Sequence, residues 1–104
     1  MILEEDYKKN IISLAEKFTV PLEIWAYGSR VNGDAHQASD LDLVVKFTDA
    51  NINIYDELMT FKKDLQESNI PILVEVRNFD LLPISFQENI LRNHEVFYSN
   101  KQNN

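Results

Sequence analysis

The sequence predicts a small α/β domain (α+β, two-layer) in which helices pack against one small mixed β-sheet. Three observations lead to this class. The chain has 104 residues, enough for one hydrophobic core but not for two. Its segments run in the order helix, strand, strand, helix, strand, helix, strand, which is typical of a sheet covered by helices. Its composition is 44% hydrophobic and 26% charged, as in ordinary globular domains.

The N-terminal segment predicts a helix, a strand and a turn. Residues 2–18 place apolar side chains at spacings of three and four, with Lys and Glu on the other face, as in an amphipathic helix. Pro21 marks the break after it. The run Leu22–Tyr27 alternates and is rich in aromatic and β-branched residues, which predicts a strand. Gly28 closes this strand, and there is room for a short helical turn just after Ser29.

A loop, a second strand and a second helix follow. The polar stretch Arg30–Ser39 has no apolar period, which predicts a loop. Apolar and polar residues alternate over Asp40–Phe47, so we expect a strand with one apolar face and one face that carries both aspartates. Apolar residues at helical spacing predict a helix over Asn53–Glu67.

A third strand and a short helix come next. Pro71 precedes the strand predicted over Ile72–Arg77, in which the side chains again alternate between two faces. After Pro83, the residues Ser85–Glu88 (Ser-Phe-Gln-Glu) fit a capping box. They predict a helix that ends near Asn93.

The C-terminal end predicts an edge strand and a tail. The strand is expected at Val96–Tyr98. Residues 99–104 are polar and are expected to be frayed. Because the chain shows neither a repeat nor a linker, residues 1–98 are expected to form a single domain.

Composition argues against several classes of protein. The formal net charge is −7, with 17 Asp and Glu against 10 Lys and Arg, which argues against direct binding of nucleic acid through its phosphates. Without cysteine there is no disulfide, thiolate zinc site or cysteine nucleophile. No stretch approaches the roughly 18 apolar residues of a membrane span, and the N-terminus does not resemble a signal peptide. We therefore expect a cytoplasmic protein with no membrane contact.

Gly28 and Ser29 are candidates for binding phosphate. A glycine at a strand end can adopt backbone angles that other residues avoid, and it lets a ligand approach closely. Ser29, followed by a helical turn, would offer backbone N–H groups and a hydroxyl to a phosphate. The alternative is an ordinary turn after a strand.

Asp40 and Asp42 are candidates for binding a metal ion. They are two residues apart on a predicted strand, so both carboxylates leave the same face, roughly 6.6–6.8 Å apart along the backbone. Oxygen ligands select Mg²⁺ or Mn²⁺, and Mg²⁺ commonly uses one or two carboxylates with substrate phosphates. Aspartate is disfavoured in strands, and adjacent like charges repel. A metal ion would compensate for both effects, whereas the alternative is a solvated acidic face.

Glu75 is the sole carboxylate within the apolar run Ile72–Val76. In one interpretation it faces water at a sheet edge and pairs with Arg77. In the other it lies beside Asp40 and Asp42 and completes a cluster of three carboxylates. The residues by themselves leave both interpretations open.

Together, Gly28-Ser29, ten intervening residues and Asp40-x-Asp42 form the pattern G-S-x10-D-x-D. With this pattern the chain resembles the nucleotidyltransferase superfamily that includes DNA polymerase β. More narrowly, the segments Tyr27–Gly33 and Ser39–Val44 resemble the minimal nucleotidyltransferases, the MNT proteins. The resemblance implies the nucleotidyltransferase fold. It also implies transfer of a nucleoside monophosphate from a nucleoside triphosphate, by family default ATP, to an acceptor hydroxyl.

The resemblance assigns the nucleotide-binding residues. Gly28 and Ser29 would hold the triphosphate, and Arg30 could meet a phosphate. Gly33 and Ser39 belong to the same nucleotide-binding segments. Asn32 stands where a basic residue is common in the family, so one possible phosphate contact is missing.

The resemblance also assigns the catalytic and metal-binding carboxylates. Asp40 and Asp42 would bind Mg²⁺ or Mn²⁺. Glu75 matches the third carboxylate, which ligates the metal on the acceptor side and helps to take the acceptor's proton. The family commonly has Asp there, and the longer Glu side chain is a departure that bears on turnover.

The resemblance further implies a partner. Minimal proteins of this kind commonly act as the antitoxin of a type VII-like toxin–antitoxin pair, in a hetero-oligomer with a helical HEPN-domain RNase toxin on which they place AMP at a tyrosine. Two alternatives stay open at this point. One is a binding module that neutralises its partner by occlusion, and the other is a transferase that acts on a small molecule such as an aminoglycoside.

Overall fold

The computed structural model describes residues 1, 3–33, 39–49 and 53–101. Within these ranges the strands form one sheet of four, in the order β3-β2-β1-β4. Strand β1 pairs antiparallel with both β2 and β4, whereas β2 and β3 are parallel. This mixed sheet confirms the predicted fold class. The strands are β1 (Leu22–Tyr27), β2 (Leu41–Phe47), β3 (Val74–Asn78) and β4 (Glu95–Ser99).

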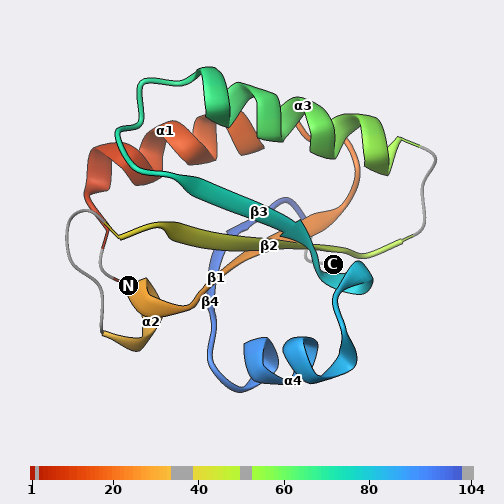
Figure 1. Ribbon diagram of the computed structural model, residues 1–104. Coiled ribbons are helices and arrows are strands. Elements are labelled where there is room, and N and C mark those ends of the chain that lie inside the picture. The colour runs from red at the N-terminus through yellow and green to blue at the C-terminus, as the bar shows by residue number, and fades with distance from the viewer. Residues whose placement is uncertain (2, 34–38, 50–52, 102–104) are drawn as a thin grey trace.

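Helices lie on both faces of the sheet (Figure 1). Helices α1 (Glu5–Ala15) and α3 (Ile54–Glu67) contact each other and cover one face. The 3-10 helix η1 (Phe79–Leu81) and α4 (Ile84–Arg92) lie on the other face, and α2 (Ser29–Asn32) directly follows β1. The helix α4 therefore adds a partial third layer to the two layers that the sequence predicts.

The main hydrophobic core lies between the sheet and the pair α1 and α3. Alternate residues of β1 and β2 point into it, as the alternating pattern predicts. The ring of Phe18 packs 5.2 Å from that of Phe61 and 6.3 Å from that of Phe47, which joins the end of the helical layer to the sheet. The large side chains that are fully buried are Ile11, Leu22, Ile24, Leu41, Leu43, Val44 and Val45.

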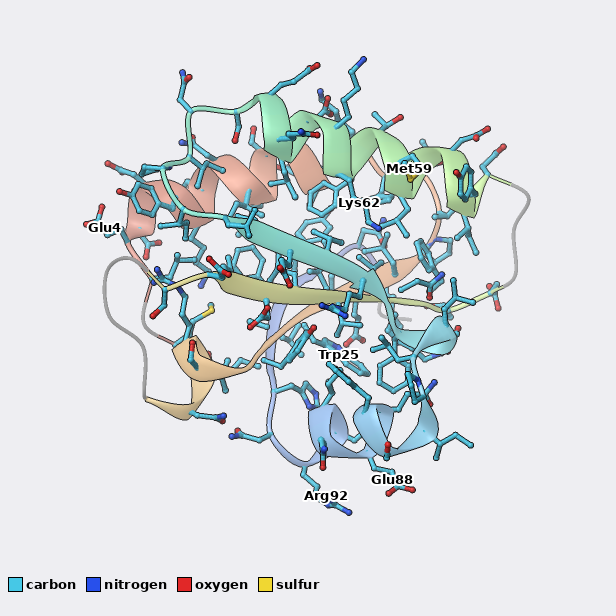
Figure 2. All side chains as sticks on the ribbon, viewed as in Figure 1. Glu4, Trp25, Met59, Lys62, Glu88 and Arg92 are labelled. Atoms are coloured by element: carbon cyan, nitrogen blue, oxygen red, sulfur yellow. The ribbon has the colours of Figure 1, made fainter. Side chains whose placement is uncertain are left out.

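A second, smaller cluster lies between the sheet and α4. Its buried members are Tyr27, Val44, Phe79 and Ile90. Figure 2 places Trp25 between the sheet and this helix, where its ring lies 5.3 Å from the ring of Phe79. Because the cluster is small, α4 leaves polar residues of β2 and β3 uncovered on this face.

Four predicted elements begin later than the sequence pattern indicates. Strand β2 begins at Leu41 rather than Asp40, and helix α3 begins at Ile54 rather than Asn53. Helix α1 begins at Glu5, and it ends at Ala15 because the chain tightens into i→i−3 hydrogen bonds and turns before Phe18. Strand β3 begins at Val74 rather than Ile72, and the N–H of Leu41 donates to the carbonyl of Leu73 at the start of the β2–β3 ladder.

The predicted capping box at Ser85 is wrong. Helix α4 starts at Ile84 with Pro83 as its N-cap, so Ser85 lies inside the first turn and makes no cap hydrogen bond. The side chain of Gln87 instead donates to the carbonyls of Phe79 (3.0 Å) and Leu82 (3.1 Å), which fixes α4 to η1. A tertiary contact, rather than a local motif, therefore fixes the start of this helix.

The predicted tail is in contact with the domain over its first residues. Strand β4 continues through Ser99. The side chain of Asn100 accepts from the N–H of Leu22 (2.8 Å) and donates to the carbonyl of Val20 (3.0 Å). Residues 102–104 lie outside the described residues. Within the described ranges, no helix combines the length and apolar character that crossing a bilayer requires.

Candidate active site

Gly28 forms the sharp turn between β1 and α2. Its backbone angles are φ 80° and ψ −154°, a combination that is almost restricted to glycine. A Cβ atom at this position would lie 2.6 Å from Oδ2 of Asp42. The glycine therefore allows the backbone to pass directly against a carboxylate of the neighbouring strand, and α2 begins immediately after it at Ser29.

Asp42 lies in a row of polar side chains that crosses three strands. It is the register partner of Tyr27 on β1 and of Glu75 on β3. Side chains directly opposite one another in a sheet share a face, and this is the face on which α4 packs. The structure thus brings Glu75 beside Asp42, as the three-carboxylate interpretation predicts. Asp40 is exposed, just before β2.

The carboxylate of Asp42 is partly buried and lies near two other negative charges. Burial raises the pKa of Asp42 above its ordinary value, and the negative charges of Glu75 and Asp40 raise it further. Arg77 opposes the shift without cancelling it. The pKa of Tyr27 is likewise raised, first by burial and then by Asp42. A bound cation would relieve this repulsion.

Arg77 lies two residues after Glu75 on the same face of β3. Its Nη2 donates to Oε2 of Glu75 at 3.2 Å, and both side chains are partly exposed. Its guanidinium also lies 5.8 Å from the ring centre of Phe86. Glu75 therefore pairs with Arg77 and also lies beside Asp42, whereas the cluster of three carboxylates that would include Asp40 stays a prediction. The alternation of β3 was the signal that could have placed Arg77 in the site.

Arg30 connects the two halves of the motif. Its side chain is only 3% exposed, and Nε and Nη2 donate to the carbonyl of Ser39 at 3.1 and 2.7 Å. It thereby holds together the two ends of the segment 34–38, which itself lies outside the described residues. The predicted phosphate contact of Arg30 stays a prediction.

Gly33 and Ser29 frame α2. Gly33 ends the helix in the left-handed region, with φ 86°, and a Cβ there would meet no atom within 4 Å. The backbone N–H of Gly33 donates to the carbonyl of Ser29 at 3.1 Å. The geometry explains Gly33 as a helix C-cap. The nucleotide-binding roles predicted for Gly28, Ser29, Gly33 and Ser39 stay predictions.

The carboxylates suit a divalent cation in chemistry but do not form a ready three-ligand group. Among the residues that the structure describes, no three His, Cys, Asp or Glu side chains are arranged to hold a metal ion. Mg²⁺ needs only one or two carboxylates when a substrate supplies phosphate oxygens. Asp42, whose charge is poorly compensated, and Asp40 beside it fit that requirement. The metal-binding and catalytic roles of Asp40, Asp42 and Glu75 stay predictions.

Two hollows adjoin these residues. One of about 220 Å³ lies between α2 and α4, and Gly28 lines it. The other, of about 460 Å³, runs along β3 and α3 and includes Glu75 and Arg77 in its lining. The carboxylates therefore lie between two places where ligands or partner side chains could approach.

A model of the family described as "Polymerase beta, Nucleotidyltransferase" matches residues 9–103. No curated protein matches the chain. Among solved structures, a toxin–antitoxin complex with AMP-PNP contains a chain that is 18% identical with a TM-score of 0.61, covering 90% of this chain and 74% of that one.

Two further solved structures are similar. A chain of the toxin–antitoxin complex MntA–HepT is 14% identical with a TM-score of 0.57, and the match covers 92% of this chain and 73% of that one. A tri-AMPylated Shewanella oneidensis HEPN toxin in complex with MNT antitoxin contains a chain 14% identical with a TM-score of 0.58, covering 93% and 73%. At these identities the similarity establishes the fold.

Proposed function

This chain belongs to the polymerase beta nucleotidyltransferase family, and from that premise we propose that it transfers AMP from ATP to a hydroxyl group. The acceptor in this proposal is a tyrosine of a HEPN-type RNase toxin, for which the chain serves as antitoxin. One observation carries the proposal: Asp42 and Glu75 are register partners, with Gly28 directly against Asp42. The similar solved structures that contain AMP-PNP or a tri-AMPylated HEPN toxin support the choice of nucleotide and partner.

The turn at Gly28 would receive the phosphates. Glycine leaves room for them against the backbone, beside the N–H and hydroxyl of Ser29 at the start of α2. Asp40 and Asp42 would hold Mg²⁺. When bound, the ion would neutralise the charge that develops on the phosphate oxygens. The contribution of the chain is to hold these groups in one fixed arrangement.

The reaction forms one bond and breaks one. The acceptor oxygen bonds to the α-phosphorus of ATP, and the bond from that phosphorus to the oxygen bridging to the β-phosphate breaks. Pyrophosphate leaves with the electron pair, and the hydroxyl proton passes to the carboxylate of Glu75. Arg77 must release Glu75 for that step. An exposed pair of this kind is weak, so nucleotide phosphates can compete for the guanidinium.

Intact-mass spectrometry tests the proposal. The protein is mixed with the product of its neighbouring gene, expected to be a helical HEPN-type toxin, ATP and Mg²⁺. We expect the partner to gain the mass of AMP, and peptide mapping should place it on a tyrosine. Asp40→Ala/Asp42→Ala should abolish the gain, whereas the control Asp49→Ala/Asp56→Ala removes two exposed carboxylates elsewhere and should preserve it. Equal modification by wild type and Asp40→Ala/Asp42→Ala would refute the assignment.

A second candidate function is neutralisation by binding alone. It is favoured by the pairing of Glu75 with Arg77 and by the lack of a ready three-ligand group among the described residues. If this function is the correct one, the Asp40→Ala/Asp42→Ala variant still suppresses toxicity and no partner gains mass. The mass measurement, together with a toxicity assay of the same variant, therefore distinguishes the two functions.

A further inference from the structure

We propose that the hollow between α2 and α4 holds the sugar and base of the nucleoside triphosphate. The inference rests on the proposed function, because it takes the phosphates to bind at the turn formed by Gly28. The hollow has a volume of about 220 Å³. Its lining includes Tyr27, Gly28, Asn32, Phe86, Asn89 and Asn93.

The hollow is continuous with the turn formed by Gly28. Gly28 lines it and also lies against Oδ2 of Asp42. A ligand whose phosphates contact this turn therefore has its remaining part beside the hollow. Pockets that hold a whole small-molecule ligand generally measure about 300–1,000 Å³. A hollow of about 220 Å³ thus suits part of a nucleotide, with the phosphates outside on the turn.

The chemistry of the lining suits a neutral, hydrogen-bonding group. Its described side chains include no Lys, Arg, Asp or Glu, but they include the amides of Asn32, Asn89 and Asn93. Each amide offers two donor hydrogens and an acceptor oxygen. Asn93 donates to Asn32, and Asn89 accepts from Arg92, so these contacts hold the amides in place without using their full capacity. Sugar hydroxyls and base edges match such groups, whereas phosphates favour cations.

One wall of the hollow is a positioned aromatic ring. Phe86 is half-buried, and its ring meets that of Tyr27 edge-on at 5.8 Å between centres. The hydrogen bonds of Gln87 to η1 and the buried Ile90 fix the helix that carries it. A ring held in this way offers a flat surface on which a nucleobase can stack.

The test compares two ligands that share only the phosphates. Binding of ATP and of inorganic tripolyphosphate is measured by calorimetry in the presence of Mg²⁺. We expect Asn89→Ala and Phe86→Leu to weaken ATP binding by about tenfold, the scale of one lost stacking or hydrogen-bonding contact. Their affinity for tripolyphosphate should be unchanged. The control Asn10→Ala, on the exposed face of α1, should alter neither affinity.

The outcomes separate this inference from the proposed function. ATP binding by wild type that Asn89→Ala and Phe86→Leu leave unchanged would overturn the inference and spare the proposed function. Equal weakening of both ligands by those variants would also overturn it, because the hollow would then serve the phosphates. Binding of neither ligand by wild type would overturn the proposed function itself. Thermal unfolding of each variant establishes whether it is folded. If Phe86→Leu does not fold, Asn89→Ala still allows the test, because Asn89 is exposed.

Discussion

The two faces of the sheet are built from the same strands but have opposite properties. On the face toward α1 and α3, the β2 residues Leu41, Leu43 and Val45 are fully buried in apolar surroundings. On the face toward α4, Asp42 and Glu75 stand side by side, and Arg77 offsets the negative charge around Asp42 only in part. Figure 1 shows two long helices over the first face and the shorter α4 over the second. The buried apolar face stabilises the fold, and this stability offsets the repulsion between the like charges on the other face.

This arrangement depends on the register of the strands. Successive residues of a strand point to opposite faces, so a slip of one residue would exchange the apolar and acidic sets. The apolar face therefore fixes the carboxylates as firmly as it fixes the core. Separate substitutions on the two faces should accordingly affect stability and activity separately.

The largest expected effect on stability is that of Leu43→Ala. Leu43 has no exposed surface, and its truncation leaves a cavity under α1 and α3. We expect the free energy of unfolding to fall by about 2–5 kcal/mol, measured by urea denaturation. The matched control Leu73→Ala, at a leucine that is 58% exposed, should change it by less than about 0.5 kcal/mol. Similar losses in the two variants would contradict the assignment of the core to this face.

Gly28→Ala is the next largest effect and affects the acidic face. The new Cβ would lie 2.6 Å from Oδ2 of Asp42, at backbone angles that alanine avoids. We expect a loss of about 1–3 kcal/mol in the free energy of unfolding, together with weaker ATP binding in titrations. Gly33→Ala is the matched control, since its φ is also positive but no atom lies within 4 Å of its Cβ. It should lose about 1 kcal/mol, and an equal loss of stability in the two variants would argue against a specific clash between a Cβ at position 28 and Asp42.

The elements of this fold were predictable from local pattern. Strand β1 occupies the predicted residues, and the alternation of β2 predicted both its apolar and its acidic face. The start of α4 was not predictable, because Gln87 fixes it through carbonyls of a preceding segment. A local motif such as the Ser85 capping box competes poorly with contacts of that kind.

The site was predictable in its residue types but not in its geometry. Spacing predicted Asp40 and Asp42 on one strand, but β2 begins at Leu41 and Asp40 lies just before it. Only the β2–β3 register shows Glu75 opposite Asp42. That pairing joins segments more than thirty residues apart, and no local period encodes it. The buried position of Arg30 and its hydrogen bonds to the carbonyl of Ser39 were not predictable from the sequence either. The phosphate contact expected for Arg30 stays a prediction.

Glu57→Gln should produce a smaller change, on the helical face. Burial acts to raise the pKa of Glu57, but hydrogen bonds from the hydroxyl and N–H of Thr19 outweigh it and lower the pKa below its ordinary value of 4.5. Stability from this group is therefore present above pH 4.5 and is lost as the pH falls through the lowered pKa. We expect Glu57→Gln to cost about 1 kcal/mol at neutral pH, with the difference from wild type shrinking in acid. A pH-independent difference in chemical denaturation would exclude this ionic role.

Asp42→Asn should give the smallest change in stability, and of the opposite sign. Burial, Glu75 and Asp40 raise the pKa of Asp42 above its ordinary value of 3.8, so the folded chain holds this proton more tightly than the unfolded chain does. Stability is then lost as the pH rises from 3.8 through the raised pKa. The neutral amide avoids it, so in EDTA at pH 7 the variant should gain about 0.2–1 kcal/mol, the scale of one cross-strand pair. In acid the two proteins should converge. The same variant should lose AMP transfer in the mass assay, because the repulsion it removes is what a bound cation would neutralise. A variant that is less stable than wild type at pH 7 would instead show that Asp42 stabilises the fold. The contrast between a stabilising apolar face and a destabilising acidic face would then be wrong.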